Sequence, residues 1–455
     1  MYWTFVNLTS LSSVLLVFLP SLYQNVHIFA SPAEAILDFP VFFTKIELYA
    51  GRRTEPVRRK ECKKPVEFTF SRRSQKIEEG IFSLLNTKKE ELIRAGRTVY
   101  NFSVGTPDFH PPIHIMEAMK KACSIPENYK YSLTDRPELL DAVKTFYQKR
   151  FGVELCQNQI MSLYGSQEGM AHIGLVLCDP GDTVLVPDPG YPVFGVGPEL
   201  TGAKCVMYPL YKENNFLPDF RDIPEEEADR AKFMIISYPA NPVCSVADDH
   251  FYEEAVAFAK RHRIILLHDN AYADLVYGGK TGKSFLSYPG AVETGVEFYS
   301  LSKSYNMTGM RISFAVGNEA VIREFKKVRS QIDYGIFLPV QYAAIAALTG
   351  PQDSVKEQCA LYEERCRTLC RGLTSVGWNV PDGQGTMFVW APIPNHYKSS
   401  EKFALDLMEQ AGVIVVPGTA FGRLGEGYVR IALVYPPEEI QKAIQAIAES
   451  GILNP

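Results

Sequence analysis

The stretch Ser300-Leu301-Ser302-Lys303-Ser304-Tyr305-Asn306-Met307-Thr308-Gly309-Met310-Arg311 follows an apolar run that includes Val296 and Phe298. The run has the composition of a buried strand, and the hydroxyl-rich residues after it indicate a strand end that opens into a loop. In open α/β sheets, ligands bind beyond the carboxyl ends of the strands. A desolvated lysine in such a place can act as a nucleophile or form a Schiff base. Lys303 is therefore either an ordinary solvated lysine or a catalytic one, and the rest of the chain has to decide.

The segments around this stretch alternate short apolar runs with helical periodicity. This alternation is typical of βαβ units and predicts an α/β fold with a mainly parallel sheet. We expect strands over residues 183–186, 233–237, 263–267, 296–300 and 312–316, and helices over residues 137–150, 167–178 and 249–261.

The pattern of apolar and charged residues changes again after Pro351. We expect helices over residues 75–95, 355–373 and 437–448, and strands over residues 99–105, 386–390 and 428–434. These elements predict a smaller α+β domain made of residues 74–115 and 339–455, beside a large cofactor-binding domain over residues 116–338. His110 and His114 have the spacing of a metal pair, but Pro111 and Pro112 between them oppose a helix. We therefore place both histidines in a loop and expect no metal site.

The composition is that of an ordinary globular protein and excludes several classes of function. The chain has 455 residues, of which 46% are hydrophobic and 22% charged, and a formal net charge of −5. A chain this long is expected to form two domains, and its acidity gives no case for a nucleic-acid partner. Its nine cysteines lack CxxC pairs, which argues against a disulfide framework or a structural zinc site. A cytoplasmic location fits these features best.

Residues 1–73 differ from everything that follows. The apolar run from Leu11 to Leu19 is short for a membrane span and is interrupted at Pro20, and no lysine or arginine precedes Lys45. A basic tract follows, from Arg52 to Arg73. We expect a disordered or accessory leader with no part in function, and keep a targeting signal or membrane anchor as the alternative.

Polar residues follow four of the predicted strands. The strands over residues 183–186, 233–237, 263–267 and 296–300 lead into Tyr191, Asn241, Asp269 with Tyr272, and Ser302 with Lys303. The carboxyl ends of parallel strands meet at one rim of a sheet, so we expect these side chains to grip one ligand. Asp269 follows an apolar run and should be deep, either as a loop cap or as the partner of a protonated ring nitrogen.

Three further features could bind anions. Gly165-Ser166-Gln167 begins the helix expected over residues 167–178, where Ser166 is either an ordinary cap or part of a phosphate site. Arg311 could add a fixed positive charge to the same phosphate. Arg430 stands in an apolar strand, either on a surface edge or as a fork for a carboxylate. With Lys303 and Asp269, these groups predict a site for pyridoxal phosphate, which has a phosphate, a pyridine nitrogen and an aldehyde, acting on an amino acid.

The sequence from residue 75 onward resembles the fold-type I, class I/II aminotransferases that use pyridoxal phosphate. The resemblance rests on Ser300-x-Ser302-Lys303 with Arg311, on Asp269-x-x-Tyr272 and on Asn241-Pro242. Residues 296–318 look most like the bacterial LL-diaminopimelate, alanine and aspartate aminotransferases. The resemblance implies a seven-stranded, mainly parallel sheet flanked by helices, a smaller α+β domain and a homodimer with shared active sites.

The resemblance also implies a role for each matching residue. Lys303 would hold the cofactor as a Schiff base and move the substrate proton, while Asp269 would keep the ring nitrogen protonated. Asn241 and Tyr272 would bind the phenolic oxygen, and Tyr191 would stack on the ring. The phosphate would be held by Ser166, Gln167, Ser300, Arg311 and, from the neighbouring subunit, Tyr131. The substrate carboxylate would bind Arg430, helped by the backbone of Gly105, next to Asn241.

Some residues depart from the family pattern, and the substrate stays open. Many relatives have Asn-Pro-Thr-Gly where this chain has Asn241-Pro242-Val243-Cys244, and a glycine at Ser313. No arginine lies between Asp269 and Lys303, which favours LL-diaminopimelate or alanine, with 2-oxoglutarate or pyruvate as acceptor, over a strict aspartate enzyme. The alternatives are a C–S lyase or decarboxylase on the same fold, and a non-catalytic regulatory or membrane-tethered protein.

Overall fold

The computed structural model describes residues 68–75, 77 and 81–454, and residues 69–455 form one unit. The predictions about residues 1–67, including the leader's order and its contact with a membrane, lie outside the described residues. The short helix α1 (Arg72–Gln75) ends the basic tract. None of the helices in the described ranges is both long enough and apolar enough to cross a bilayer.

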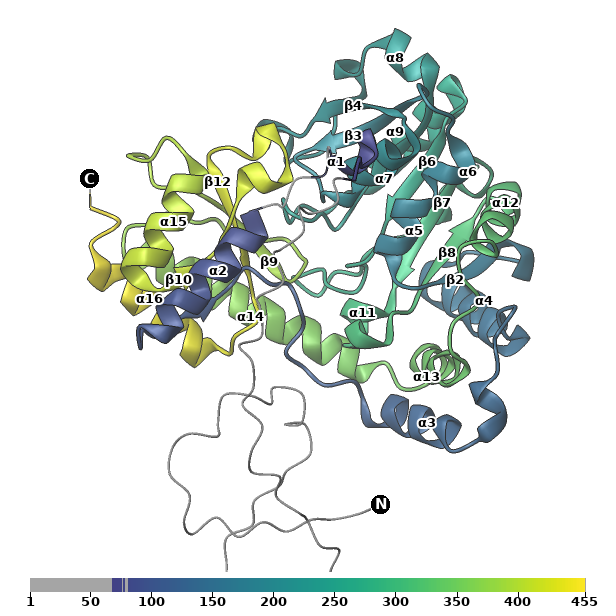
Figure 1. Ribbon diagram of the computed structural model, residues 1–455, viewed down its shortest axis with the longest axis horizontal. Coiled ribbons are helices and arrows are strands. Elements are labelled where there is room, and N and C mark those ends of the chain that lie inside the picture. Colours follow the sequence, from purple (N-terminus) through teal and green to yellow (C-terminus); the bar gives the residue numbers. More distant parts are fainter. Residues whose placement is uncertain (1–67, 76, 78–80, 455) are drawn as a thin grey trace, which may run out of the picture. The chain divides into compact units, whose positions relative to one another are not determined.

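A seven-stranded sheet carries the middle of the chain (Figure 1). Its strand order is β2-β8-β7-β6-β5-β3-β4, and β8 is the strand that runs antiparallel to its neighbours. The mainly parallel sheet predicted from the alternating pattern is therefore present. The strands are β2 (Ile160–Leu163), β3 (Thr183–Asp188), β4 (Lys204–Pro209), β5 (Ala231–Ile236), β6 (Ile265–Asp269), β7 (Gly295–Ser300) and β8 (Ser313–Gly317).

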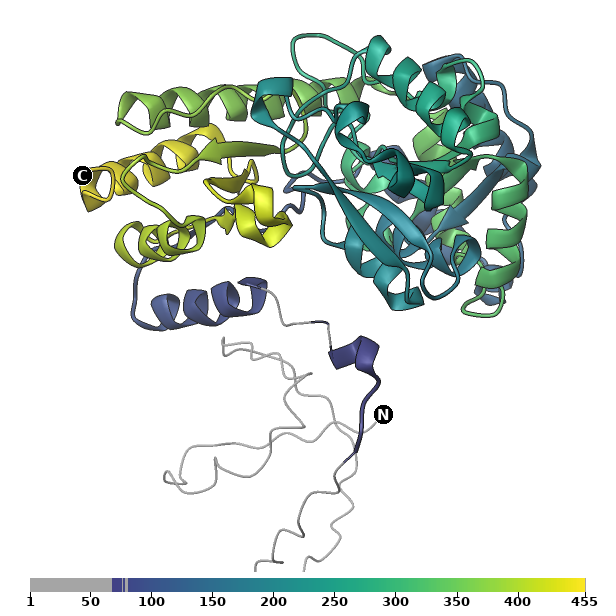
Figure 2. The ribbon, with the colours of Figure 1, turned by 90° about the horizontal axis from the view of Figure 1, so that it is seen from above.

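Helices cover both faces of this sheet (Figures 1 and 2), which explains why its central strands are apolar on both sides. One face packs against α5 (Ser166–His172), α7 (Val193–Thr201) and α12 (Glu319–Arg329) through residues such as Met170, Phe194 and Phe325. The other face packs against α4 (Pro137–Phe151) and α9 (Asp249–His262) through residues such as Phe146 and Phe251.

The C-terminal part builds a second, smaller sheet of order β11-β12-β9. The strands are β9 (Phe388–Pro392), β11 (Val416–Pro417) and β12 (Tyr428–Ala432), all antiparallel, while β1 (Tyr100–Asn101) pairs with β10 (Val413–Ile414). The helices of this region are α2 (Ile81–Arg94), α14 (Asp353–Ser375), α15 (Ser400–Ala411) and α16 (Pro437–Ser450). The large and small domains, with boundaries at residues 116 and 338, stay a proposal.

The remaining helices lie in connections or near the loop ends. They are α3 (Ile113–Cys123), α6 (Gly174–Leu177), α8 (Glu225–Arg230), α10 (Ala291–Thr294), α11 (Leu301–Ser304) and α13 (Leu338–Thr349). Helix α13 packs along α3, and the long helix α14 runs from the smaller sheet toward α11 (Figure 1).

Several local predictions were wrong, each for an identifiable reason. His114 lies in α3 and not in a loop, because Pro112 occupies the cap position before the helix, where a proline costs nothing. The helix expected over residues 167–178 is two short helices, and Leu175 is 47% exposed, so its apolar residues do not all face the core. The strand expected over residues 99–105 is limited to Tyr100–Asn101. Strands β2 and β4 were missed.

Candidate active site

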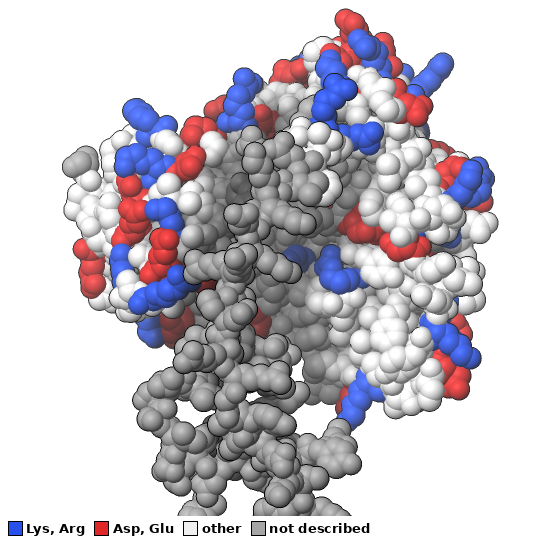
Figure 3. Space-filling view, viewed as in Figure 1, with Lys and Arg blue, Asp and Glu red and all other residues white. Residues whose placement is uncertain are grey.

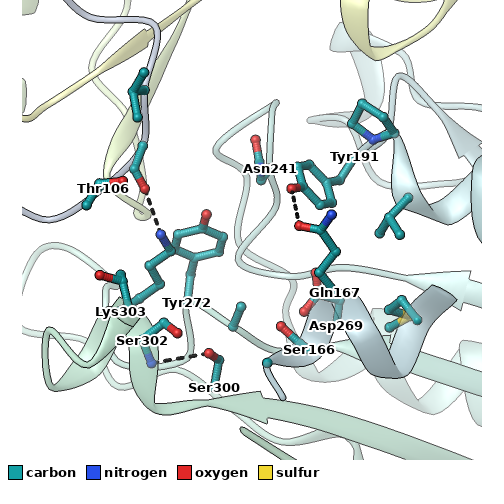
Figure 4. A pocket seen from close by; sticks show the side chains of 18 of the residues that line it. Thr106, Ser166, Gln167, Tyr191, Asn241, Asp269, Tyr272, Ser300, Ser302 and Lys303 are labelled. Carbon is teal, nitrogen blue, oxygen red and sulfur yellow. Dashed lines mark hydrogen bonds between the residues drawn. The ribbon is translucent and has the colours of Figure 1, made fainter. Parts of the chain in front are cut away.

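A cavity of about 750 Å³ opens beyond the carboxyl ends of β5, β6 and β7 (Figure 4). Its volume lies in the range of small-molecule sites. Every site residue predicted from the sequence lines it except Tyr131. Those lining residues are Gly105, Ser166, Gln167, Tyr191, Asn241, Asp269, Tyr272, Ser300, Lys303, Arg311 and Arg430.

Lys303 stands on the single-turn helix α11, directly after β7. Ser300 caps this helix by accepting the backbone N–H of Ser302 at 3.2 Å, which fixes the turn that follows the strand (Figure 4). The Lys303 Nζ points into the cavity and donates to the Gly105 carbonyl at 2.6 Å. Burial, with the charges of Arg430 and Arg311, lowers the pKa of Lys303 to about 8. Its amine therefore exchanges protons near neutral pH.

Side chains from outside the cavity hold the backbone of Lys303. Gln358 of α14 donates its amide to the Lys303 carbonyl at 2.8 Å. Ser304 donates to Asp274 at 2.6 Å, and Arg150 pairs with the same carboxylate at 3.1 Å. These contacts fix the backbone from which the lysine side chain enters the cavity.

Asp269 ends β6 and is buried, as its apolar run predicted. Its Oδ1 lies in a buried position without a hydrogen-bond donor among the described residues. Burial raises the pKa of Asp269 to about 6, against the lowering effects of the His268 charge, the Ala271 backbone N–H and Lys303. An ionised carboxylate with an open acceptor at the cavity wall fits a protonated ring nitrogen.

The far side of the cavity is built around Arg311. Its guanidinium donates to the carbonyls of Thr308 at 3.0 Å and Tyr164 at 3.0 Å. A Cβ on Gly165 would lie 2.2 Å from Arg311 Nη2, so only glycine lets the arginine approach the start of α5. Gly165 is the cap residue of α5 and Ser166 the first helical residue, so the ordinary-cap interpretation of Ser166 was wrong. A positive charge beside the Ser166 and Ser300 hydroxyls suits a phosphate.

Two tyrosines complete the wall. Tyr191 lies across the cavity from Lys303 and donates its hydroxyl to Gln167 at 3.1 Å (Figure 4). Tyr272 packs edge-on against Phe388, with 5.8 Å between ring centroids, and burial raises its pKa well above the ordinary value. Burial therefore keeps the Tyr272 hydroxyl protonated, as a donor to an oxygen in the cavity.

Arg430 comes from the smaller sheet. It is 4% exposed and lies on β12, the middle strand, so the surface-edge alternative was wrong. Its Nη1 donates to Asn241 Oδ1 at 2.9 Å and its Nη2 to the Ser103 carbonyl at 3.1 Å. Although burial lowers the pKa of Arg430 to about 10, the group stays charged at neutral pH.

The Arg430 guanidinium packs against two aromatic rings. It lies 4.2 Å from the Phe388 ring centroid and 4.6 Å from that of Phe421. Neither phenylalanine was predicted as a site residue, because an aromatic residue in a strand or loop is usually part of the core. Gln358, which holds the Lys303 backbone, was missed for a similar reason: its role depends on a contact across the fold.

The loop that carries Asn241 keeps its shape without the glycine common at residue 244. Cys244 has a φ of 61°, in the left-handed region that favours glycine. Its N–H donates to the Ala240 carbonyl at 2.8 Å, and its thiol accepts a hydrogen bond from Thr386 at 3.4 Å. These bonds hold a strained residue and thereby keep Asn241 beside Arg430.

The model of the family "Aminotransferase class I and II" matches residues 97–447 of the chain. The chain belongs to this family. It is 41% identical over 381 residues to an LL-diaminopimelate aminotransferase of Dehalococcoides mccartyi, covering 83% of this chain and 98% of that protein. The LL-diaminopimelate aminotransferase of Moorella thermoacetica is 42% identical, with 83% and 97% covered.

Solved structures of related proteins have the same fold as this chain. The substrate-bound BacF structure from Bacillus subtilis superimposes with a TM-score of 0.81 at 34% identity, covering 84% of this chain and 98% of that one. A probable N-succinyldiaminopimelate aminotransferase from Thermus thermophilus gives a TM-score of 0.77 at 34% identity, covering 82% and 100%. The fold is therefore fold type I, as predicted.

The chain is a pyridoxal-phosphate-dependent aminotransferase, and the cofactor prediction is confirmed. The open Oδ1 of Asp269 and the close approach of Gly165 to Arg311 fit the two ends of pyridoxal phosphate. When bound, this cofactor supplies an electron sink for the carbon that bears the amino group. The alternatives of a C–S lyase, a decarboxylase or a non-catalytic protein find no support in these comparisons.

Proposed function

We propose that this aminotransferase uses LL-diaminopimelate as amino donor and a 2-oxo acid, 2-oxoglutarate or pyruvate, as acceptor. The observation that carries the proposal is the match to enzymes named LL-diaminopimelate aminotransferase along 97–98% of their length, at 41–42% identity. The lack of an arginine between Asp269 and Lys303 supports a donor other than aspartate.

In this proposal each site residue predicted from the sequence has a defined role toward the cofactor or the substrate. Lys303 would hold the cofactor through its aldehyde and would take and return the proton at the substrate α-carbon. Asp269 would keep the ring nitrogen protonated. The phenolic oxygen is bound by Asn241 and Tyr272, and the ring by Tyr191; the phosphate is bound by Ser166, Gln167, Ser300 and Arg311.

Arg430 binds the α-carboxylate of the substrate next to the Gly105 backbone. The charged side chains that line the cavity, among the described residues, are Asp269, Lys303, Arg311 and Arg430. All four are assigned to the cofactor or to the α-carboxylate. The far ammonium and carboxylate of LL-diaminopimelate therefore need polar groups from the mouth of the cavity or from a second subunit.

We also propose that the second subunit supplies Tyr131 to the phosphate, in a homodimer with shared sites. Tyr131 is 79% exposed, away from the cavity of its own chain, and packs against Tyr334 at 4.8 Å between ring centroids. Neighbouring large apolar side chains are also exposed, and the surface over α13 and the adjacent part of α3 carries few charges (Figure 3). These exposed residues are Ile113, Met116, Tyr129, Leu133 and Phe337. A patch of this kind is typical of an interface.

The substrate proposal is tested by a panel of amino donors with purified enzyme, each offered with 2-oxoglutarate and with pyruvate. We expect LL-diaminopimelate to give the highest kcat/KM, with alanine and aspartate at least about ten-fold lower, a difference of about 1.4 kcal/mol in transition-state binding. A higher kcat/KM for alanine or aspartate would refute the proposal. Release of pyruvate and ammonia without an acceptor acid would instead indicate a lyase.

The dimer proposal is tested by mixing two inactive variants, Tyr131→Ala and Lys303→Ala. A hybrid dimer then has one site with both Tyr131 and Lys303 intact, so random mixing should restore about a quarter of wild-type activity. Mixtures that stay inactive while forming hybrid dimers would show that Tyr131 does not act across the interface.

A further inference from the structure

A histidine and a glutamate form an ion pair within the seven-stranded sheet, behind the active site. His268 of β6 and Glu297 of β7 are register partners, and both are 0% exposed. His268 directly precedes Asp269, so the two side chains project from opposite faces of the strand. The pair therefore lies on the face away from the cavity, in the layer packed by α4 and α9.

Glu297 is surrounded by hydrogen-bond donors. Its Oε1 accepts the hydroxyl of Tyr147 at 2.8 Å, and its Oε2 accepts the Ser284 hydroxyl at 2.8 Å and the Phe285 backbone N–H at 3.2 Å. The Ser284 hydroxyl already accepts a backbone N–H from Leu286, so its own hydrogen is free for Glu297. Three donors besides His268 favour the ionised form of this carboxyl group.

Both ring nitrogens of His268 face acceptors. Nδ1 lies 2.9 Å from Glu297 Oε2, and Nε2 lies 3.0 Å from the carbonyl of Tyr238. A carbonyl oxygen cannot donate, so Nε2 must carry a hydrogen. With Glu297 as an ionised acceptor, Nδ1 carries a hydrogen as well. The hydrogen-bond geometry thus fits a doubly protonated, positively charged ring.

Among the described residues, the other side chains that contact the ring are aromatic. Tyr252 of α9 and Phe285 approach it edge-on, at 5.5 and 5.6 Å between ring centroids, and Tyr147 of α4 reaches only Glu297. On its own strand, the neighbouring charge is Asp269. A buried ion pair costs much of its attraction in lost hydration and is weak evidence for stability. Because the His268–Glu297 pair lies one residue from Asp269, we look for its role in the active site and not in stability.

We propose that His268, held as an imidazolium by Glu297, is a positioning residue that keeps Asp269 ionised and fixes the strand end that carries Asn241. The first effect comes from a buried positive charge one residue away. The second comes from the hydrogen bond to Tyr238, which begins the loop leading to Asn241. This inference rests on the role proposed above for Asp269.

The electrostatics of Asp269 agree with this assignment. Burial raises the pKa of the Asp269 carboxyl, and the charge of His268 is the largest of the effects that lower it. Removing that charge would raise the pKa further, so Asp269 would take up a proton at a higher pH. The ring nitrogen of the cofactor would then lose its anionic partner as the pH falls.

The protonation of His268 is tested by neutron diffraction from deuterium-exchanged crystals of the holoenzyme at about pH 8, where an ordinary histidine is neutral. We expect deuterons on both Nδ1 and Nε2. In Glu297→Gln, the glutamine amide can donate to Nδ1, so we expect a single deuteron, on Nε2. A single deuteron on the wild-type ring would overturn the inference, whether or not the variant folds.

The effect on the reaction is tested by the pH profile of kcat/KM. We expect the acidic limb of Glu297→Gln to move upward by about one pH unit, at the lower end of what a nearby opposite charge does. Tyr147→Phe is the matched control: it removes one donor to Glu297 but leaves the His268 contact, so its limb should stay in place. An unmoved limb in Glu297→Gln would refute the electrostatic role.

The two proposals fail in different ways. If Asp269→Asn kept full activity, the role proposed for Asp269 would be wrong, and the neutron experiment could still find a charged His268. If Asp269→Asn were inactive and the wild-type His268 ring neutral, the role of Asp269 would stand and the positioning pair would be refuted.

Discussion

The seven-stranded sheet and the smaller three-stranded sheet each bring to the same cavity a cation whose pKa is lowered, Lys303 and Arg430, in contrasting ways. Lys303 stands at a strand end, and its Nζ makes one hydrogen bond within the described part of the chain, to the Gly105 carbonyl. Arg430 stands in the middle of a strand, where it donates two hydrogen bonds and lies against two aromatic rings. Burial lowers the pKa of both, to about 8 and about 10.

Burial alone therefore does not set the chemical role of a cation. At neutral pH a small fraction of Lys303 is neutral, so the amine can act as nucleophile and base. Arg430 stays charged and is held in one orientation, as a carboxylate fork requires. The seven-stranded sheet thus positions Lys303, which can exchange a proton, and the smaller sheet positions Arg430, which keeps its charge.

The largest effect is expected from giving residue 303 a permanent charge. We expect Lys303→Ala to be colourless or weakly coloured and to lose at least about 10⁴-fold in kcat. Lys303→Arg keeps a cation and should be as inactive as the alanine variant, because its guanidinium cannot release a proton. Single-turnover absorbance with an amino acid measures both, and an active Lys303→Ala would sink the assignment.

The converse exchange gives Arg430 the properties of a lysine. Arg430→Lys loses the forked geometry and the contact with both rings, so we expect kcat/KM to fall about 100-fold, mostly through a higher KM. Steady-state kinetics with the preferred donor separates KM from kcat. A loss confined to kcat would mean that Arg430 acts on the reacting carbon and not on the carboxylate.

Stability should also distinguish the two cations. The pKa of Lys303 falls from 10.5 to about 8 on folding, so between these pH values the folded protein binds fewer protons than the unfolded chain. The loss of folding stability caused by burying the charged lysine is therefore complete below pH 8 and vanishes near pH 10.5. Lys303→Met should therefore raise the unfolding free energy of the cofactor-free protein at neutral pH by about 3 kcal/mol. Thermal unfolding at several pH values measures this gain, which should disappear in alkali.

Arg430→Met is the matched control for that experiment. It leaves Asn241 Oδ1 and the Ser103 carbonyl without their donor, so the relief from burying a charge is offset. We expect little or no stabilisation. An equal gain in both variants would show that the hydrogen bonds of Arg430 add nothing to the folded state.

The smallest effect concerns the strained turn beside Arg430. Because Cys244 has a positive φ, we expect Cys244→Gly to be more stable than Cys244→Ala by about 1 kcal/mol. Both replacements remove the thiol, so the comparison isolates the backbone. Chemical denaturation of the two variants measures the difference, and equal stabilities would place the strain elsewhere.

The residues at strand ends were predictable because the rule behind them is local. An apolar run followed by polar residues indicates where a strand ends, and parallel strands end at one rim, which brought Asn241, Asp269 and Lys303 together. The family resemblance then supplied their roles. The same local pattern identified the parallel sheet, apart from β2 and β4 at its two edges.

Contacts between distant segments could not be predicted in this way. The bond from Gln358 to the Lys303 carbonyl and the rings around Arg430 join residues far apart in the chain, and nothing near them in the sequence marks the contact. His268 and Glu297 stand in apolar runs, where a lone charged residue usually indicates an exposed edge. Only the register of β6 and β7 shows that they neutralise each other.

Gly105 contacts the surroundings of both cations, because its carbonyl accepts from Lys303 and its Cα lies against Phe388, which packs on Arg430. This arrangement limits which substitutions the sequence can accept during evolution. A Cβ there would lie 2.4 Å from the Phe388 ring, which in turn lies against Arg430. A side chain at residue 105 is therefore tolerated only after Phe388 has become smaller, and that change weakens the support of Arg430. The effect of a substitution at one of these positions depends on which residues occupy the other two. We therefore expect Gly105, Phe388 and Arg430 to be substituted together or to be retained together.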